Sequence, residues 1–111
     1  MRRLLTRKLV LEAQGVAPDG AGGYSGDWAA LGTHWAEVVQ RSGRLEAGEG
    51  AARSRMSYLV RVRAVAPGQP SRPRAGQRFR DGNRVFLIRS VSEARSGESL
   101  LECLTDEELL P

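Results

Sequence analysis

Several short segments of this chain alternate between apolar and polar residues, the pattern of a β-strand with one buried face. The clearest segment spans residues 56–65, where every even-numbered position from 58 to 64 is aliphatic or aromatic and both Arg61 and Arg63 fall on the other side. A similar alternation runs over residues 5–13, with Leu9 and Leu11 on one side. The pattern therefore predicts two strands that each bury one face.

Turn residues divide the second half of the chain into hairpins. Asp81-Gly82-Asn83 separates residues 77–79 from 84–91, and an Asp-Gly pair between alternating apolar residues favours a tight hairpin turn. Gly97 then separates this strand from a further one at 99–104. The segment 28–39 fits helical and strand spacing alike, and Gly32 and Thr33 favour a strand that starts near Thr33.

Three other segments lack this alternation and are predicted to be loops. Residues 15–27 are rich in glycine, residues 42–55 are small and polar with a weak helical segment as the alternative, and residues 66–76 contain three prolines. Residues 105–111 are predicted to form an acidic tail. The sum is an all-β protein of mainly β structure, a small β-barrel or sandwich of five to six short strands with long loops and at most one short helix. We expect a single domain over residues 1–111.

Length and composition agree with one domain and exclude several classes of protein. The chain has 111 residues and a mass of 12.1 kDa, enough for one core. It contains no apolar run of roughly 18–20 residues, so no membrane span is expected. Charged residues interrupt the first 13 positions, which argues against a secretory signal. Cys103 is the single cysteine, and we expect it to be a reduced core residue.

The charge is unevenly distributed along the chain. The net charge is +4, but the stretch from Arg53 to Arg95 holds eleven arginines and two acids, a local balance of +9. The last fourteen residues hold five acids and no base. Such a chain offers complementary patches with which one subunit could attract the next. The alternative is that the acidic end is a solvated tail without a function.

Residues with catalytic chemistry are scarce. His34 is the single histidine and lies beside Trp35 in an apolar stretch, where a structural role is the simpler interpretation. We find no nucleophile motif, phosphate-binding glycine loop or metal-ligand spacing, so we expect neither an enzyme nor a metal or cofactor site. Trp28 and Trp35 are expected to be core or interface anchors. One function that the basic composition leaves open is a β-barrel module that binds nucleic acid.

The order and spacing of five segments resemble a known family. A basic group precedes a strand at Arg2 to Leu11, Trp35-Ala36-Glu37-Val38 opens the next strand, and Tyr58-Leu59-Val60-Arg61-Val62-Arg63 forms the central one. Phe86-Leu87-Ile88-Arg89-Ser90-Val91 and the closing strand Leu100 to Leu104 follow. This layout resembles the head-closure, or stopper, proteins that join the DNA-filled head to the tail in long-tailed phages and gene transfer agents.

The resemblance implies a structural role in the particle. It implies a small β-barrel in a homo-oligomeric ring, a hexamer or dodecamer, that lies below the adaptor and portal complex. Such a ring would close the head, retain packaged double-stranded DNA and dock the tail terminator or tail tube. The particle would be a virion or gene transfer agent assembled in the host cytoplasm, with no membrane partner. A tail terminator or adaptor of the same particle is the alternative.

Candidate site residues fall into two groups. Arg53 and Arg55 end the expected loop at 43–55, which we predict to project into the channel and contact DNA phosphates, with an ordinary surface loop as the alternative. The acidic end could dock on the Arg61 and Arg63 surface of a neighbouring subunit. The candidates for the subunit or partner interface are Trp28, Trp35, Arg61, Arg63, Arg89, Asp106, Glu107 and Glu108.

Overall fold

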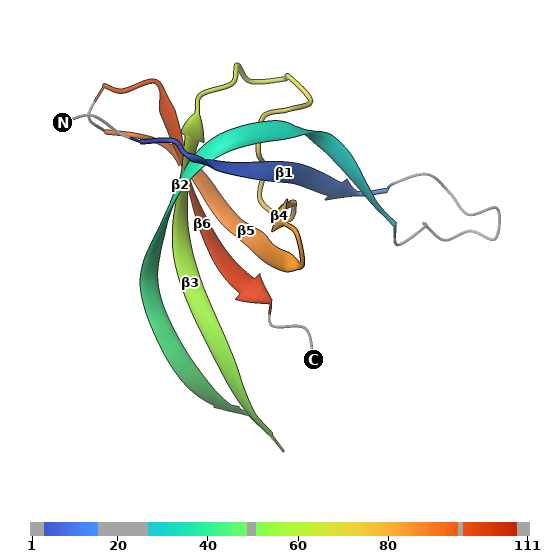
Figure 1. Ribbon diagram of the computed structural model, residues 1–111, viewed down its shortest axis with the longest axis vertical. Coiled ribbons are helices and arrows are strands. Elements are labelled where there is room, and N and C mark those ends of the chain that lie inside the picture. Colours follow the sequence, from blue (N-terminus) through green and yellow to red (C-terminus); the bar gives the residue numbers. More distant parts are fainter. Residues whose placement is uncertain (1–3, 16–26, 49–50, 96, 109–111) are drawn as a thin grey trace.

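The structure is a computed structural model that describes residues 4–15, 27–48, 51–95 and 97–108, with only the backbone described in 42–48 and 51–55. It contains no helix within these residues, which confirms the all-β prediction (Figure 1). The strands are β1 (Arg7–Gln14), β2 (Trp28–Gly48), β3 (Ala51–Arg63), β4 (Arg78–Asp81), β5 (Arg84–Glu93) and β6 (Leu100–Glu108).

The six strands close into an antiparallel barrel in the order β1-β2-β3-β6-β5-β4. Closure depends on the short pairing of β1 with β4, in which Leu11 lies opposite Phe79. The long strand β2 pairs with β1 up to Ala36 and with β3 from Ala36 onward, so it bends between two parts of the barrel. Because closure leaves few unpaired edges, this small sheet can be stable as a single layer wrapped around one core.

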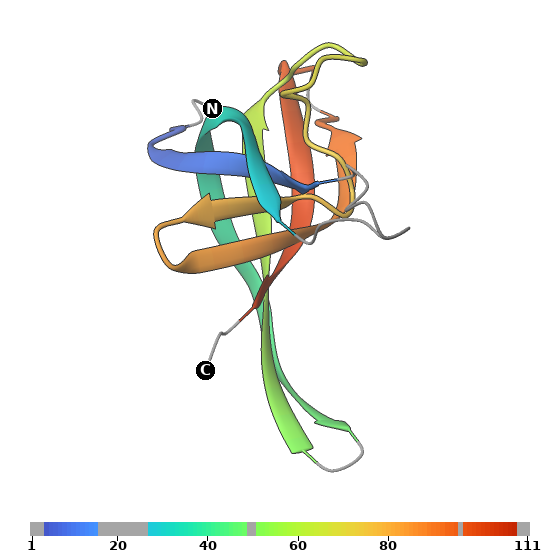
Figure 2. The ribbon, with the colours of Figure 1, turned by 90° about the vertical axis from the view of Figure 1, so that its right-hand side faces the viewer.

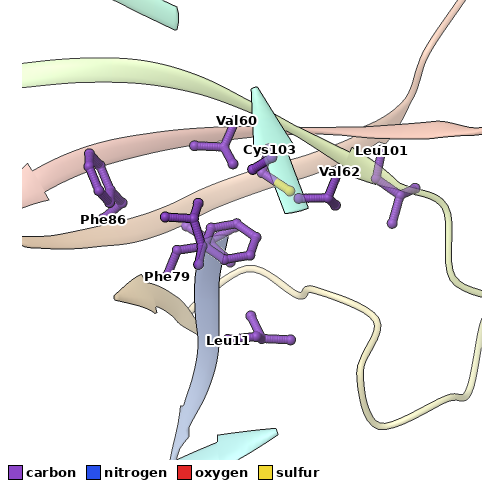
Figure 3. Close-up of a cluster of buried hydrophobic side chains, with 10 residues drawn as sticks. Leu11, Val60, Val62, Phe79, Phe86, Leu101 and Cys103 are labelled. Atoms are coloured by element: carbon purple, nitrogen blue, oxygen red, sulfur yellow. The ribbon is translucent and has the colours of Figure 1, made fainter. Parts of the chain in front are cut away.

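The predicted alternation fills the barrel interior. Leu9 and Leu11 of β1, Val60 and Val62 of β3 and Cys103 of β6 are all fully buried in one cluster (Figure 3). Phe79 and Phe86 face each other across the β4–β5 hairpin and complete the cluster. Fully burying side chains of this size contributes about 1.5–3 kcal/mol each. The core therefore comes from the same inward positions that the period of two identified in the sequence.

The segment predicted to be a loop at 42–55 is instead part of a long two-stranded ribbon. Strands β2 and β3 stay paired down to Gly48 and Ala51, beyond the last pair of β3 with β6 at Met56 (Figure 2). The prediction failed because alanine, glycine and serine give no strand signal, whereas the backbone hydrogen bonds of a ladder need no particular side chain. The ribbon leaves the barrel just past a register shift between Gln40 and Ser42.

The proline-rich connection between β3 and β4 is a loop, as predicted, but it packs on the barrel. Pro73 is fully buried, and Nε2 of His34 lies 2.7 Å from the carbonyl oxygen of Ser71. Gly32 also approaches this loop closely, since a Cβ built there would lie 3.3 Å from Cβ of Ser71. The connection therefore covers one end of the barrel, and His34 has the structural role expected of it.

Two further predictions concern the remaining segments. The acidic end is not a free tail through residue 108, because residues 105–108 belong to β6 and Thr105 and Glu107 are buried. Most of the glycine-rich loop expected at 15–27 lies outside the described residues, but its base is closed by a hydrogen bond of 2.6 Å from the Gly15 N–H to the Asp27 carbonyl. The hairpin expected at Gly82 is confirmed, with a φ of 60° at that glycine.

Candidate assembly surface

Strands β2, β3 and β6 are neighbours and present one continuous outer surface, here called the β2–β3–β6 face. In each strand the residues that alternate with the core point outward, and the register decides which of them meet. The side chains of this face are Trp35, Glu37 and Val39 of β2, Leu59, Arg61 and Arg63 of β3, and Glu102, Leu104 and Asp106 of β6. The fold thus brings together four of the predicted interface residues, namely Trp35, Arg61, Arg63 and Asp106.

A charged row crosses the middle of this face. Glu37, Arg61 and Glu102 lie side by side in the register, and Arg61 donates to both carboxylates at 2.8 Å. Partial burial acts to lower the pKa of Arg61, but the hydrogen bonds to Glu102 and Glu37 outweigh it, and the pKa is raised above its usual value. Arg61 therefore has its counter-charges within its own subunit.

An apolar row lies next to the charged row. Val39 pairs with Leu59, and Leu59 pairs with Leu104 on the third strand. Leu59 is 6% exposed although it does not belong to the core cluster, while Val39 and Leu104 remain 37% and 45% exposed. The sequence analysis missed this row. The signal was present in the alternation itself, because these three residues are apolar at positions that alternate with the core.

Trp35 lies on the other side of the charged row and is 55% exposed. It pairs with Lys8 of β1, and because Ala36 pairs with Val62, the next outward positions, Trp35 and Arg63, are neighbours. Both Lys8 and Arg63 are exposed. The Trp35 indole lies between two basic positions on the outside of the barrel and is therefore available for contact with another molecule.

The acidic residues of β6 do not form one patch. Asp106 accepts a hydrogen bond of 2.9 Å from Ser57 and pairs with Nε of Arg89 at 3.2 Å, so Arg89 lies at the edge of the β2–β3–β6 face. Glu107 points inward, and Glu108 is exposed at the end of the strand. Three consecutive acids thus have three different surroundings.

Glu107 closes the end of the barrel from which the ribbon leaves. Arg84 donates to its two carboxylate oxygens at 2.7 and 3.0 Å and lies over the rings of Phe86 and Tyr58, with its Cζ 5.0 and 5.6 Å from their centroids. The hydrogen bonds from Arg84 hold the pKa of Glu107 below its usual value, against the effect of burial. The Glu107 carboxylate therefore has its ion-pair partner within its own subunit.

Trp28 begins β2 and is packed within the subunit. The guanidinium of Arg78 lies 4.1 Å from the centre of its ring, a cation–π distance. Arg78 also donates to Glu12 at 2.7 Å, so the buried carboxylate, the arginine and the indole form one stack across β1, β4 and β2. The contact anchors the start of β2 to the closing strand pair.

Arg53 and Arg55 lie in the ribbon. Their backbones pair with Glu46 and Arg44 of β2, respectively. Their side chains lie outside what the structure describes. The two positions are therefore in a strand that extends from the barrel: Arg55 lies one residue beyond the last pair of β3 with β6, Met56 with Glu107, and Arg53 lies farther out.

The cysteine of this chain lies in surroundings that suppress its reactivity. Burial raises the pKa of Cys103 to about 12, despite a nearby Arg72, so this thiol is not a nucleophile at neutral pH. In the described part of the chain no three histidine, cysteine or carboxylate side chains gather as metal ligands would. The same part includes no helix that is long and apolar enough to cross a membrane.

The described part of the chain is a closed barrel with a projecting ribbon and an exposed outer face, and each of its buried side-chain polar atoms has a hydrogen-bond partner. The sequence matches the phage head completion protein family over residues 2–108. The chain belongs to this family, whose members are structural proteins of the phage particle and not enzymes.

A solved structure also contains a similar chain. A chain in the virion of a native gene transfer agent particle is similar to this one, with 42% sequence identity and a TM-score of 0.86. The match covers 99% of this chain and 100% of that one. No curated protein matches the chain. The resemblance of the sequence to head-closure proteins is thus confirmed at the level of the family.

Proposed function

We propose that several copies of this chain form a ring, a hexamer or dodecamer, at the junction between the DNA-filled head and the tail. The ring would lie below the adaptor and portal complex, close the head and dock the tail terminator or tail tube. Its role would be structural, without catalysis. The observation that carries the proposal is the 42% identity over almost the entire chain to a protein of a gene transfer agent virion, together with membership of the head completion family.

The ribbon supports a role in DNA retention. Beyond the last pair of β3 with β6 it extends over residues 44–48 of β2 and 51–55 of β3, without any third strand on the β3 side, and it carries Arg53 and Arg55. In a ring, an extended element of this kind can reach the central channel, and arginines there would contact phosphate oxygens without reading sequence. We therefore propose these two arginines as DNA contacts.

The test is the double variant Arg53→Ala, Arg55→Ala. We expect rings of normal mass and heads that lose their DNA, because the barrel is unchanged while two phosphate contacts per subunit are removed. The matched control is Arg74→Ala, Arg95→Ala, which removes two exposed arginines of the barrel loops and should retain DNA. Normal DNA retention in the ribbon variant would contradict the assignment.

The second candidate is a nucleic-acid-binding module that acts without a particle. The observation that favours it is a set of exposed bases, Lys8, Arg41, Arg63, Arg74 and Arg95, that have no carboxylate partner among the described side chains. A module of this kind would bind bare duplex as a monomer, with an affinity that falls steeply with salt. A monomer that ignores heads and binds duplex in this way would favour this candidate over the ring.

A further inference from the structure

We propose that the β2–β3–β6 face is a docking site for a different protein of the head–tail junction, and not for a second copy of this chain. The partner surface would be apolar at its centre and acidic at its rim. The inference rests on the proposed function, because it takes the partner from the junction. It adds a surface, a set of contact residues and the chemistry of the partner.

The β2–β3–β6 face exposes three apolar side chains. Trp35, Leu104 and Val39 are 55%, 45% and 37% exposed, and the strand register puts them on one face. Single exposed apolar residues are common on a protein surface, but a group that shares one sheet face marks a contact surface. Tryptophan is also among the residues that carry most of the free energy of binding at interfaces.

The charged row fixes the side chains in the middle of this face. Because its charges are paired with one another, a partner needs no charge opposite them. Arg61 is held from both sides by Glu37 and Glu102 at 2.8 Å. A partner that covers this row meets side chains whose charges are already paired. It therefore does not have to supply a counter-charge to Arg61, and the apolar positions on either side of the row can dominate the contact.

The rim gives the sign of the partner's charge. Lys8 and Arg63 flank Trp35, are exposed, and have no carboxylate partner among the side chains that the structure describes. An approaching surface with carboxylates opposite these two residues is attracted and oriented, while a basic surface is repelled. We therefore expect the partner to carry acidic residues at the rim of its contact surface.

A second copy does not provide such a rim from its described side chains. Its carboxylates on the sheet surfaces are already bonded to arginines, as in the pairs of Glu12 with Arg78, Glu102 with Arg61 and Asp106 with Arg89. Among the side chains that the structure describes, the exposed acids that remain are Asp27, Glu93 and Glu108, which lie at the ends of three different strands. They form no patch that could match Lys8 and Arg63, and this points to a different protein.

Two double variants of the face test the proposal, one apolar and one charged: Trp35→Ala with Leu104→Ser, and Lys8→Glu with Arg63→Glu. The matched controls are Leu4→Ser, at a residue 66% exposed outside this face, and Arg74→Glu with Arg95→Glu. Each full-length protein is checked by circular dichroism for its fold and by light scattering for self-association. Binding is then measured to DNA-filled heads and to tails, purified separately from producer cells that lack this chain.

We expect both face variants to fold and self-associate as the wild type does and to bind heads or tails about 30-fold more weakly, the loss typical of a binding hot spot. Both controls should bind like the wild type. The proposal is overturned if the face variants bind both particle halves normally, or if they lose self-association, because the face would then join copies. If the wild-type protein binds neither heads nor tails, the proposed function at the head–tail junction is wrong, and the proposed docking partner is wrong with it.

Discussion

At the scale of single residues, four arginines of this protein form ion pairs between strands of the barrel. Arg61, Arg78, Arg84 and Arg89 each bond to a carboxylate on a neighbouring strand. Cross-strand pairs of opposite charge are part of what stabilises a sheet. The basic stretch before residue 95 and the acidic stretch after residue 98 therefore meet within the barrel at three pairs, those of Arg61, Arg84 and Arg89.

Glu107 gives the clearest prediction from these pairs. Its pKa is lowered in the folded state, so its charge adds stability that is present above the ordinary pKa of 4.5 and is lost as pH falls through the lower folded value. We expect Glu107→Gln to reduce the free energy of unfolding at pH 7 by about 1–2 kcal/mol, since a charged hydrogen-bonded pair with a partly exposed arginine is weakened. Urea denaturation at pH 7 and pH 3 measures the effect.

The neighbouring exposed acid provides the control. Glu108→Gln changes the same charge one residue away and should leave the free energy of unfolding at pH 7 within about 0.5 kcal/mol of the wild type. The difference between the Glu107 variant and the wild type should shrink as pH falls from 7 to 3, because the carboxyl becomes protonated first in the unfolded state and then, at lower pH, in the folded state. A Glu107 variant as stable as the wild type at pH 7 would show that Arg84 and Glu107 do not hold this end of the barrel.

Cys103 supplies a second prediction at this scale. Its side chain is fully buried, and burial raises its pKa to about 12, so both access and thiolate formation are suppressed in the native protein. We expect a thiol-specific reagent at pH 8 to label less than about one tenth of the native protein and all of the protein in denaturant. Rapid labelling of the native protein would mean that the β3–β6–β5 side of the core opens.

At the scale of elements, the ribbon and the barrel are separable. The pairs of β2 with β3 continue from the barrel to Gly48 and Ala51, while β6 supports β3 only as far as Met56. A two-stranded ribbon by itself adds little stability. Function at the ribbon, including the proposed DNA contacts, can therefore change without affecting the core.

Shortening the ribbon tests this independence. Residues 45–54 can be replaced by Asn-Gly, which joins Arg44 to Arg55, a pair in the present register, with a two-residue hairpin turn. We expect the midpoint of thermal unfolding to stay within about 4 °C of the wild type, a change of less than roughly 1 kcal/mol. Circular dichroism measures it. A fall of more than about 10 °C would show that the ribbon is part of the barrel's stability.

The elements that the sequence predicts well are those with a buried face. The period of two identified the inward residues of β1 and β3, because burial of alternate side chains is what the pattern records. The sequence pattern does not predict the ribbon, because the ribbon residues contribute nothing to the core and are small, as residues in loops often are. The end of β6 was read as a tail because Asp106, Glu107 and Glu108 form a charge run, and only Arg84 and Arg89, far away in the sequence, show why these acids can lie in a strand.

At the scale of the whole molecule, the candidate surface was only partly predictable. Trp35, Arg61 and Arg63 stand out by residue type, whereas Val39, Leu59 and Leu104 become a row only when three strands are in register. The sequence also suggested that basic and acidic segments attract neighbouring copies. Since three pairs between those segments form within the subunit, we expect contacts between molecules to depend on the exposed bases and the apolar residues of the β2–β3–β6 face.

The proposed function of this protein depends on its position between the head and the tail of the particle. The most direct test is a count of joined particles by electron microscopy after removal of this chain from the producer cells, with the wild-type chain restored as the control. We predict that heads and tails then accumulate separately, that the heads lose DNA, and that restoring the chain recovers complete particles. Complete tailed particles that retain DNA in the absence of the chain would contradict the account.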